Sequence, residues 1–140
     1  YVPYATQRIG LYKRIAMIET EEDENDIIDE LIDRFGDPPK PTLDLLKVSL
    51  LRSAAMKCSV SSIVEEATEI RVYLSKFEYD VWSELLDGPL LKNRSMLIAA
   101  ETPNILIRKK SGENSLKLLS AVFNEFINIR ELLSDDTDGN

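Results

Sequence analysis

Acidic side chains gather densely between residues 19 and 33, and they are the groups in this chain best placed to do chemistry. Carboxylates at this density could bind a metal ion, work as an acid–base pair or pair with arginines of another protein. The members are Glu19, Glu21–Glu24, Asp26, Asp29, Glu30 and Asp33. A calcium-binding loop needs alternating carboxylates around an internal glycine, and this run contains no glycine. We therefore expect a solvated helix face here rather than a metal site.

Glu30 and Asp33 are the two acidic residues that we single out as a candidate site. They lie three residues apart, on the face of a predicted helix opposite its apolar stripe. That position exposes both carboxylates to water, which argues against an acid–base pair tuned by burial. It offers two adjacent carboxylates to an arginine-bearing surface. A protein-binding role is therefore the prediction for this pair.

The chain lacks the residues that most catalytic sites need. It contains no histidine, which excludes Ser–His triads and His-based zinc sites, and no glycine-rich phosphate loop. Its single cysteine, Cys58, is expected to be a buried small hydrophobe and agrees with a reducing compartment such as the cytoplasm. The net charge of −8 argues against nucleic-acid binding. We expect no catalytic residue, no cofactor and no metal in this chain.

Length and composition indicate one globular domain. The 140 residues are 44% hydrophobic and 30% charged, and no apolar run is long enough to span a membrane. We assign residues 1–134 to a single domain and residues 135–140 to a flexible acidic tail. The opening Tyr1-Val2-Pro3 is typical of the interior of a longer polypeptide, so we expect a domain excised from a larger protein.

Three helices are predicted in the first 55 residues. The first is capped by Thr6, with Ile9, Tyr12 and Ile15 on its inner face. The second runs from the cap Thr20 to a stop at Gly36. Its apolar stripe consists of Ile27, Ile28, Leu31, Ile32 and Phe35. The third begins at Pro41 or Thr42 and is apolar on more than one side, so it should be largely buried.

The pattern then changes to strand pairs. Residues 60–65 and 69–74 are predicted to form one hairpin, and residues 95–100 and 104–108 a second. A short helix capped by Asp80 should lie between them, and a last helix should run from Asn114 to Leu133. Paired strands grouped apart from the helices predict an α+β fold with a small antiparallel sheet of two strand pairs. The aromatic side chains expected in the core are Tyr12, Phe35, Trp82, Phe123 and Phe126.

Two blocks near the N-terminus carry a family resemblance. They are Leu11-Tyr12-Lys13-Arg14-Ile15-Ala16 and Glu30-Leu31-Ile32-Asp33-Arg34-Phe35-Gly36-Asp37-Pro38-Pro39. Together they resemble the C-terminal domain of the bacterial transcription-repair coupling factor. The similarity is dense over residues 1–39, looser from 45 to 74, and slight beyond residue 86.

The resemblance implies a function that composition cannot supply. The family is a bacterial ATP-driven DNA translocase that pushes stalled RNA polymerase off a lesion and recruits the excision-repair damage-recognition ATPase. Its C-terminal domain is non-catalytic and acts as an autoinhibitory latch on an N-terminal repair-recruiting module of the same chain. Carried over by position, the latch residues are Glu30 and Asp33. The resemblance implies neither direct nucleic-acid nor membrane binding by this domain.

Two other functions stay open from the sequence. The domain could be a generic adapter that binds a different protein through the same acidic helix. It could also be a metal-dependent enzyme that uses the acidic cluster, for which metal-dependent thermal stabilisation would be the sign. A motor domain encoded just upstream would favour the latch over the adapter.

Overall fold

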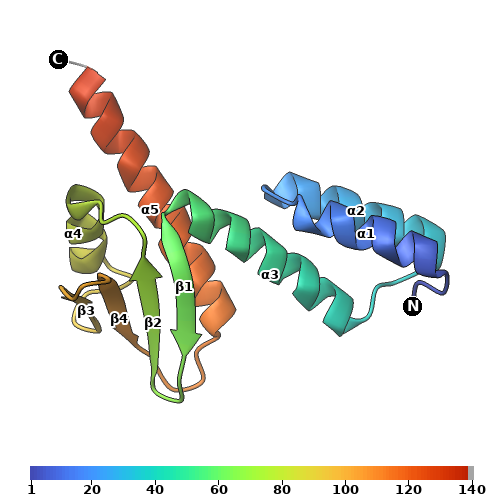
Figure 1. Ribbon diagram of the computed structural model, residues 1–140, viewed down its shortest axis with the longest axis horizontal. Coiled ribbons are helices and arrows are strands. Elements are labelled where there is room, and N and C mark those ends of the chain that lie inside the picture. Colours follow the sequence, from blue (N-terminus) through green and yellow to red (C-terminus); the bar gives the residue numbers. More distant parts are fainter. Residues whose placement is uncertain (139–140) are drawn as a thin grey trace. The chain divides into compact units, whose positions relative to one another are not determined.

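The computed structural model describes residues 1–138, with side chains through Asp135. These residues form five helices and four strands, and they divide into two compact units, one of residues 1–53 and one that begins at residue 54 (Figure 1). The predicted α+β class, with an antiparallel sheet, is confirmed. The assignment of residues 1–134 to one domain stays a prediction.

Unit 1 contains helices α1 (Ala5–Ala16) and α2 (Glu21–Phe35) and the first part of α3 (Lys40–Lys57). Figure 1 shows α1 and α2 lying side by side in opposite directions. Their apolar faces close over one core, to which the half-buried Phe35 contributes. The buried members of this core are Val2, Ile15, Ile18, Ile27, Leu31 and Leu46.

Helix α2 begins and ends where its sequence predicts. The Thr20 hydroxyl accepts a hydrogen bond from the Asp23 amide at 3.1 Å, and the Asp23 carboxylate accepts one from the Thr20 amide, which completes a capping box. Gly36 ends the helix at a φ of 81°, a conformation that favours glycine. Four acidic side chains in the first turn also match the helix dipole.

Other helix predictions in unit 1 were wrong. Helix α1 begins at Ala5, one residue before the expected cap Thr6. Tyr12 is 56% exposed, because α1 turns Leu11 and Ile15 toward the core and position 12 lies about 100° away around the helix. Helix α3 is not largely buried, since Leu45 and Val48 are each about two-fifths exposed.

Unit 2 is a four-stranded antiparallel sheet covered by helices. The strands are β1 (Val60–Glu65), β2 (Glu69–Leu74), β3 (Ser95–Ile98) and β4 (Asn104–Arg108), in the order β1-β2-β4-β3. The predicted hairpins are therefore joined into one sheet by the pairing of β2 with β4. Helix α4 (Tyr79–Asp87) is preceded by Glu78 rather than capped by Asp80.

One face of this sheet forms the core of unit 2. Ile70, Val72 and Leu74 point from β2 into it, as the alternation of the strand predicts. Helix α5 (Ser115–Asp138) covers them with Val122, Phe123 and Phe126, and the Phe126 ring lies 5.0 Å from that of Trp82 on α4 (Figure 1). Cys58 is fully buried, as expected, and burial raises the pKa of its thiol to about 12.

The last helix is longer than predicted. We expected it to end at Leu133, but α5 has helical backbone through Asp138. Most of the acidic segment expected to form a flexible tail over residues 135–140 is therefore helical, and residues 139–140 lie outside the described part. The prediction of a tail rested on the acidic, glycine-containing composition of this last segment of the sequence.

Candidate protein-interaction site on helix α2

Helix α2 carries the candidate site, and its charge is strongly one-sided. It holds eight acidic side chains and one basic one. Glu24 is an exception to the predicted solvated face, because it is 8% exposed and its carboxylate lies 3.8 Å from the ammonium of Lys47 on α3. Glu24 lies on the same face of the helix as the buried Ile27 and Leu31, so its burial could have been predicted from the helical spacing. The other acidic positions lie at or near the surface.

Asp33 is exposed, as predicted, and no ion pair or hydrogen bond to its carboxylate is found among residues 1–135. Glu30 differs from the prediction. Its side chain is 37% exposed and already pairs within unit 1, with Arg14 of α1 and, at 3.6 Å, with Arg34 one turn along α2. The two candidate residues are thus neighbours on one helix, but only Asp33 presents an unengaged carboxylate.

The Arg14–Glu30 pair closes one side of a small pocket between α1 and α2. The pocket has a volume of about 220 Å³. Its lining residues are Val2, Gln7, Gly10, Leu11, Arg14, Glu30, Leu31, Arg34 and Phe35. Among these residues, Gln7 has a side-chain oxygen that is buried without a hydrogen-bond partner. The sequence indicated Glu30 but not the pocket, because residues as distant in sequence as Gln7 and Glu30 line it.

The N-terminal segment stabilises the same end of α2. The single proton of the Tyr1 hydroxyl is shared between two carbonyls, that of Gly36 at 2.5 Å and that of Leu31 at 3.2 Å. Its ring meets Phe35 edge-on at 5.9 Å. Partial burial and the nearby carboxylate of Asp37 raise the pKa of the Tyr1 hydroxyl. These contacts hold the C-terminal turn of α2, on which Asp33 lies.

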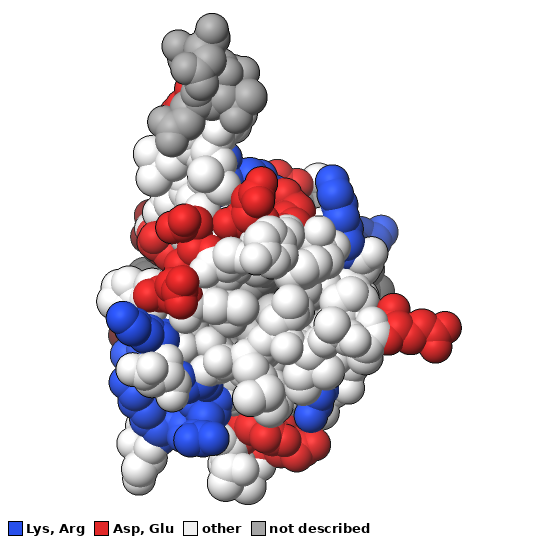
Figure 2. Space-filling view, turned by 90° about the vertical axis from the view of Figure 1, so that its left-hand side faces the viewer, with Lys and Arg blue, Asp and Glu red and all other residues white. Residues whose placement is uncertain are grey.

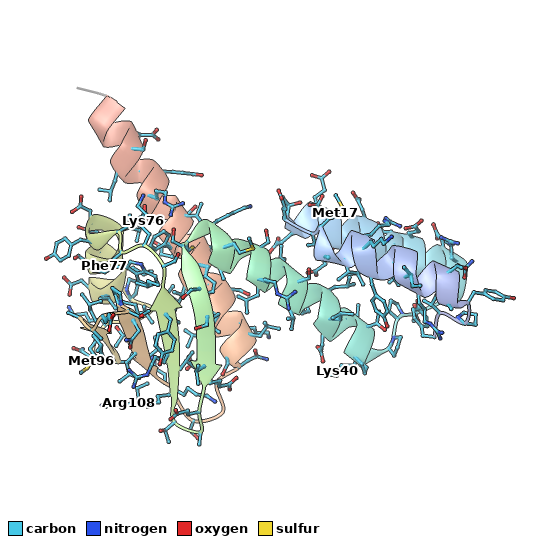
Figure 3. The ribbon with its side chains drawn as sticks, viewed as in Figure 1. Met17, Lys40, Lys76, Phe77, Met96 and Arg108 are labelled. Atoms are coloured by element: carbon cyan, nitrogen blue, oxygen red, sulfur yellow. The ribbon has the colours of Figure 1, made fainter. Side chains whose placement is uncertain are left out.

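Exposed apolar side chains also occur away from α2. Met17, just after α1, is 76% exposed, and Met96 on β3 is 56% exposed (Figure 3). Figure 2, which views the side of unit 2 where α4 and β3 lie, shows a broad area without charged side chains, bordered by acidic and basic groups. This area carries no charge pattern that would select a partner, unlike the acidic surface of α2.

Neither a metal-binding cluster nor a membrane-spanning helix is found in the part of the chain that the structure describes. No three His, Cys, Asp or Glu side chains gather there in a way that could hold a metal ion. No helix there is long and apolar enough to cross a membrane.

Comparison with known proteins decides the family. The model of the TRCF domain matches residues 1–81, which include α1, α2 and the candidate site. This chain belongs to the TRCF domain family. A transcription-repair-coupling factor of Staphylococcus epidermidis is 30% identical over 136 residues, covering 94% of this chain. That of Escherichia coli K12 is 40% identical over 63 residues, or 45% of this chain.

Solved structures support the fold of this TRCF domain. A crystal structure of the C-terminal domain of a transcription-repair coupling factor aligns with a TM-score of 0.78, at 21% identity, over 94% of this chain and 85% of that one. The chain spans only 12% of the length of the Staphylococcus epidermidis relative. The resemblance noticed in the two N-terminal blocks is therefore confirmed as family membership.

Proposed function

We propose that this TRCF domain is a non-catalytic regulatory module that binds a basic surface on an N-terminal, repair-recruiting module of its own parent protein. The parent would be a cytoplasmic, ATP-driven DNA translocase that removes stalled RNA polymerase and recruits excision repair. By covering the recruiting surface, the domain would keep the excision-repair damage-recognition ATPase away until the latch opens. Family membership and the names of the bacterial relatives support this context.

The observation that carries the proposal is the acidic surface of α2, on which Asp33 lies exposed and Glu30 half-buried. Two carboxylates one turn apart match the donor-rich guanidinium groups of a basic partner. The excess of acidic side chains on α2 would also steer a basic surface toward it. Neither residue belongs to the buried core of unit 1, so both can serve binding rather than folding.

The test reverses both charges in the full-length parent protein. Glu30→Lys with Asp33→Lys should open the latch, and the damage-recognition ATPase should then bind at least about tenfold more tightly, since removing one member of a charge pair that the closed latch buries costs about 2–5 kcal/mol. The matched control is Glu125→Lys with Glu131→Lys, which changes the charge equally at exposed positions of α5. The control protein should bind the ATPase as weakly as wild type.

Circular dichroism of the three proteins checks that each remains folded. Glu30→Gln with Asp33→Asn offers a milder pair that introduces no new charge beside Arg14 and Arg34. Equal, weak binding of the ATPase by wild type and both Glu30–Asp33 variants would reject the latch. In that case the adapter function, with a different partner for the acidic helix, becomes the better explanation.

A further inference from the structure

A groove between α1 and α3, within unit 1, brings exposed apolar side chains together. Its volume is about 310 Å³, and Tyr1, Tyr12, Pro41 and Leu45 are among the residues that line it. Tyr1 is 45% exposed, Tyr12 is 56% exposed and Leu45 is 42% exposed. Large apolar side chains that gather in one hollow, rather than lie scattered over a surface, are typical of a site that binds another molecule.

The apolar line continues along α3 beyond the groove. Val48 lies one turn after Leu45 and is 41% exposed. The sequence predicts that α3 is largely buried, because it is apolar on more than one side. In the structure one side of α3 packs into the core of unit 1 through Leu46, while the side that carries Leu45 and Val48 is open. A binding partner would supply the burial that this second side lacks.

Positive charge borders the groove, although the chain as a whole is acidic. Helix α1 carries three basic side chains and no acidic one. Arg8 lines the groove, and the exposed Arg52 lies one turn beyond Val48 on the same side of α3. Neither arginine forms an ion pair within residues 1–135. The two guanidinium groups therefore remain able to pair with carboxylates of a partner.

An amphipathic helix of a protein is the ligand that fits both features. Such a helix lays apolar side chains, spaced three and four residues apart, into an apolar groove. Acidic side chains beside its apolar face would bind the guanidinium groups of Arg8 and Arg52. Tyrosine and arginine are also frequent among the residues that contribute most to binding at protein interfaces. A nucleic acid fits less well, because its phosphate backbone is recognised by charge and gains little from Leu45 and Val48.

We propose that the groove between α1 and α3 binds an acidic amphipathic helix of a partner protein. Tyr1, Tyr12 and Leu45 contact the apolar face of that helix, and Arg8 pairs with a carboxylate at its edge. This contact is independent of the proposed latch, because α2 is acidic and would bind a basic surface. The domain then carries two binding surfaces of opposite charge.

The test titrates the isotope-labelled 140-residue chain with model peptides, while NMR follows its amide resonances. The Leu–Glu peptide is an amphipathic helix with leucine on one face and glutamate on the other, and its control keeps every glutamate but replaces leucine by alanine. The Leu–Glu peptide should shift the resonances of Tyr12 and Leu45 and bind at least about tenfold more tightly than the control, since only leucine fills the groove. Equal binding of the two peptides, or no shift at Tyr12 and Leu45, would overturn the proposal.

Variants of the chain then test which residues make the contact. Leu45→Ser and Arg8→Glu should each weaken binding of the Leu–Glu peptide about fivefold or more. Leu132→Ser changes an exposed leucine of α5, and Lys13→Glu changes an exposed charge of α1 that does not line the groove. Both controls should bind as wild type does, and circular dichroism checks that all four variants are folded. If each control weakened binding as much as its partner variant, the groove would not be the site.

A duplex DNA oligonucleotide tests the other class of ligand. The acidic chain should not bind it at physiological salt, because the net charge of −8 repels phosphate. Shifts of Tyr12 on addition of DNA that disappear in Arg8→Glu would reassign the groove to nucleic acid and overturn the proposal.

Discussion

Replacing Glu113 by glutamine should weaken unit 2 in a way that depends on pH. Glu113 lies before α5 and pairs with Arg94, which lies before β3. The guanidinium donates to the Glu113 carboxylate from Nη1, at 2.9 Å, and from Nη2, and it also donates to the Arg108 carbonyl at 2.8 and 3.0 Å. The two side chains are only 9% and 20% exposed, so this pair is poorly screened by water.

The magnitude follows from the carboxyl's pKa. Hydrogen bonds from Arg94, assisted by the Lys110 amide, hold the pKa of Glu113 at about 2, against its ordinary 4.5. A carboxyl whose pKa is lower in the folded state than in the unfolded state stabilises the fold. This stabilisation is complete at pH values above the unfolded-state pKa, and it is lost as the pH falls through the folded-state pKa. The difference of about 2.5 corresponds to at most about 3 kcal/mol at pH 7. This contribution should fall to less than half at pH 3 and be almost lost at pH 2.

The assay uses the single tryptophan of the chain. Trp82 is fully buried in unit 2, so its fluorescence during urea unfolding reports on that unit. Melts of wild type and Glu113→Gln at pH 7, 4 and 3 give the difference in unfolding free energy, and Glu131→Gln at an exposed position is the control. A difference that stays constant from pH 7 to pH 3 would refute the ion-pair reasoning, as would a difference below about 0.5 kcal/mol at pH 7.

Three further predictions concern stability and reactivity. Phe35→Ala should lower the free energy of unfolding by about 2 kcal/mol, measured by circular dichroism in denaturant. This is less than the roughly 3–5 kcal/mol lost at a fully buried phenylalanine, because Phe35 is half-buried, and a loss above about 3 kcal/mol would contradict the prediction. Thr20→Ala should cost about 1 kcal/mol through loss of the capping box, and Thr20→Ser, which keeps the hydroxyl, should cost less. Cys58, whose pKa is raised to about 12, should resist iodoacetamide at pH 8.5 in the native chain and react once urea unfolds it; equally fast labelling of both forms would show that the thiol is accessible.

Sequence alone predicted the elements that are defined by local signals. Helix α2 has a capping residue, an acidic first turn and a glycine stop, and its bounds agree with the structure. The β1–β2 hairpin was also placed correctly, because Ile70, Val72 and Leu74 alternate with polar residues and all three are buried. In both cases the information lies within a few residues of the element itself.

The errors arose where a distant partner decides the outcome. Tyr12 has the spacing of a core residue, but in the structure Leu11 and Ile15 face the core from α1 and Tyr12 is exposed. The joining of the hairpins through β2 and β4 depends on residues more than 30 positions apart. The Arg14–Glu30 ion pair could not be predicted for the same reason, because it depends on how α1 packs against α2 and not on the sequence near either residue. The candidate residues were therefore found from the sequence, but their present partner was not.

The proposed latch should depend on salt. Dissolved ions screen the attraction between surface charges, and at physiological ionic strength this attraction fades beyond about 8 Å. The acidic surface of α2 would attract a basic partner mainly through such charges. Raising the salt concentration should therefore open the latch of the full-length parent protein and strengthen its binding of the damage-recognition ATPase. Binding that does not change with salt would argue that charge does not hold the latch.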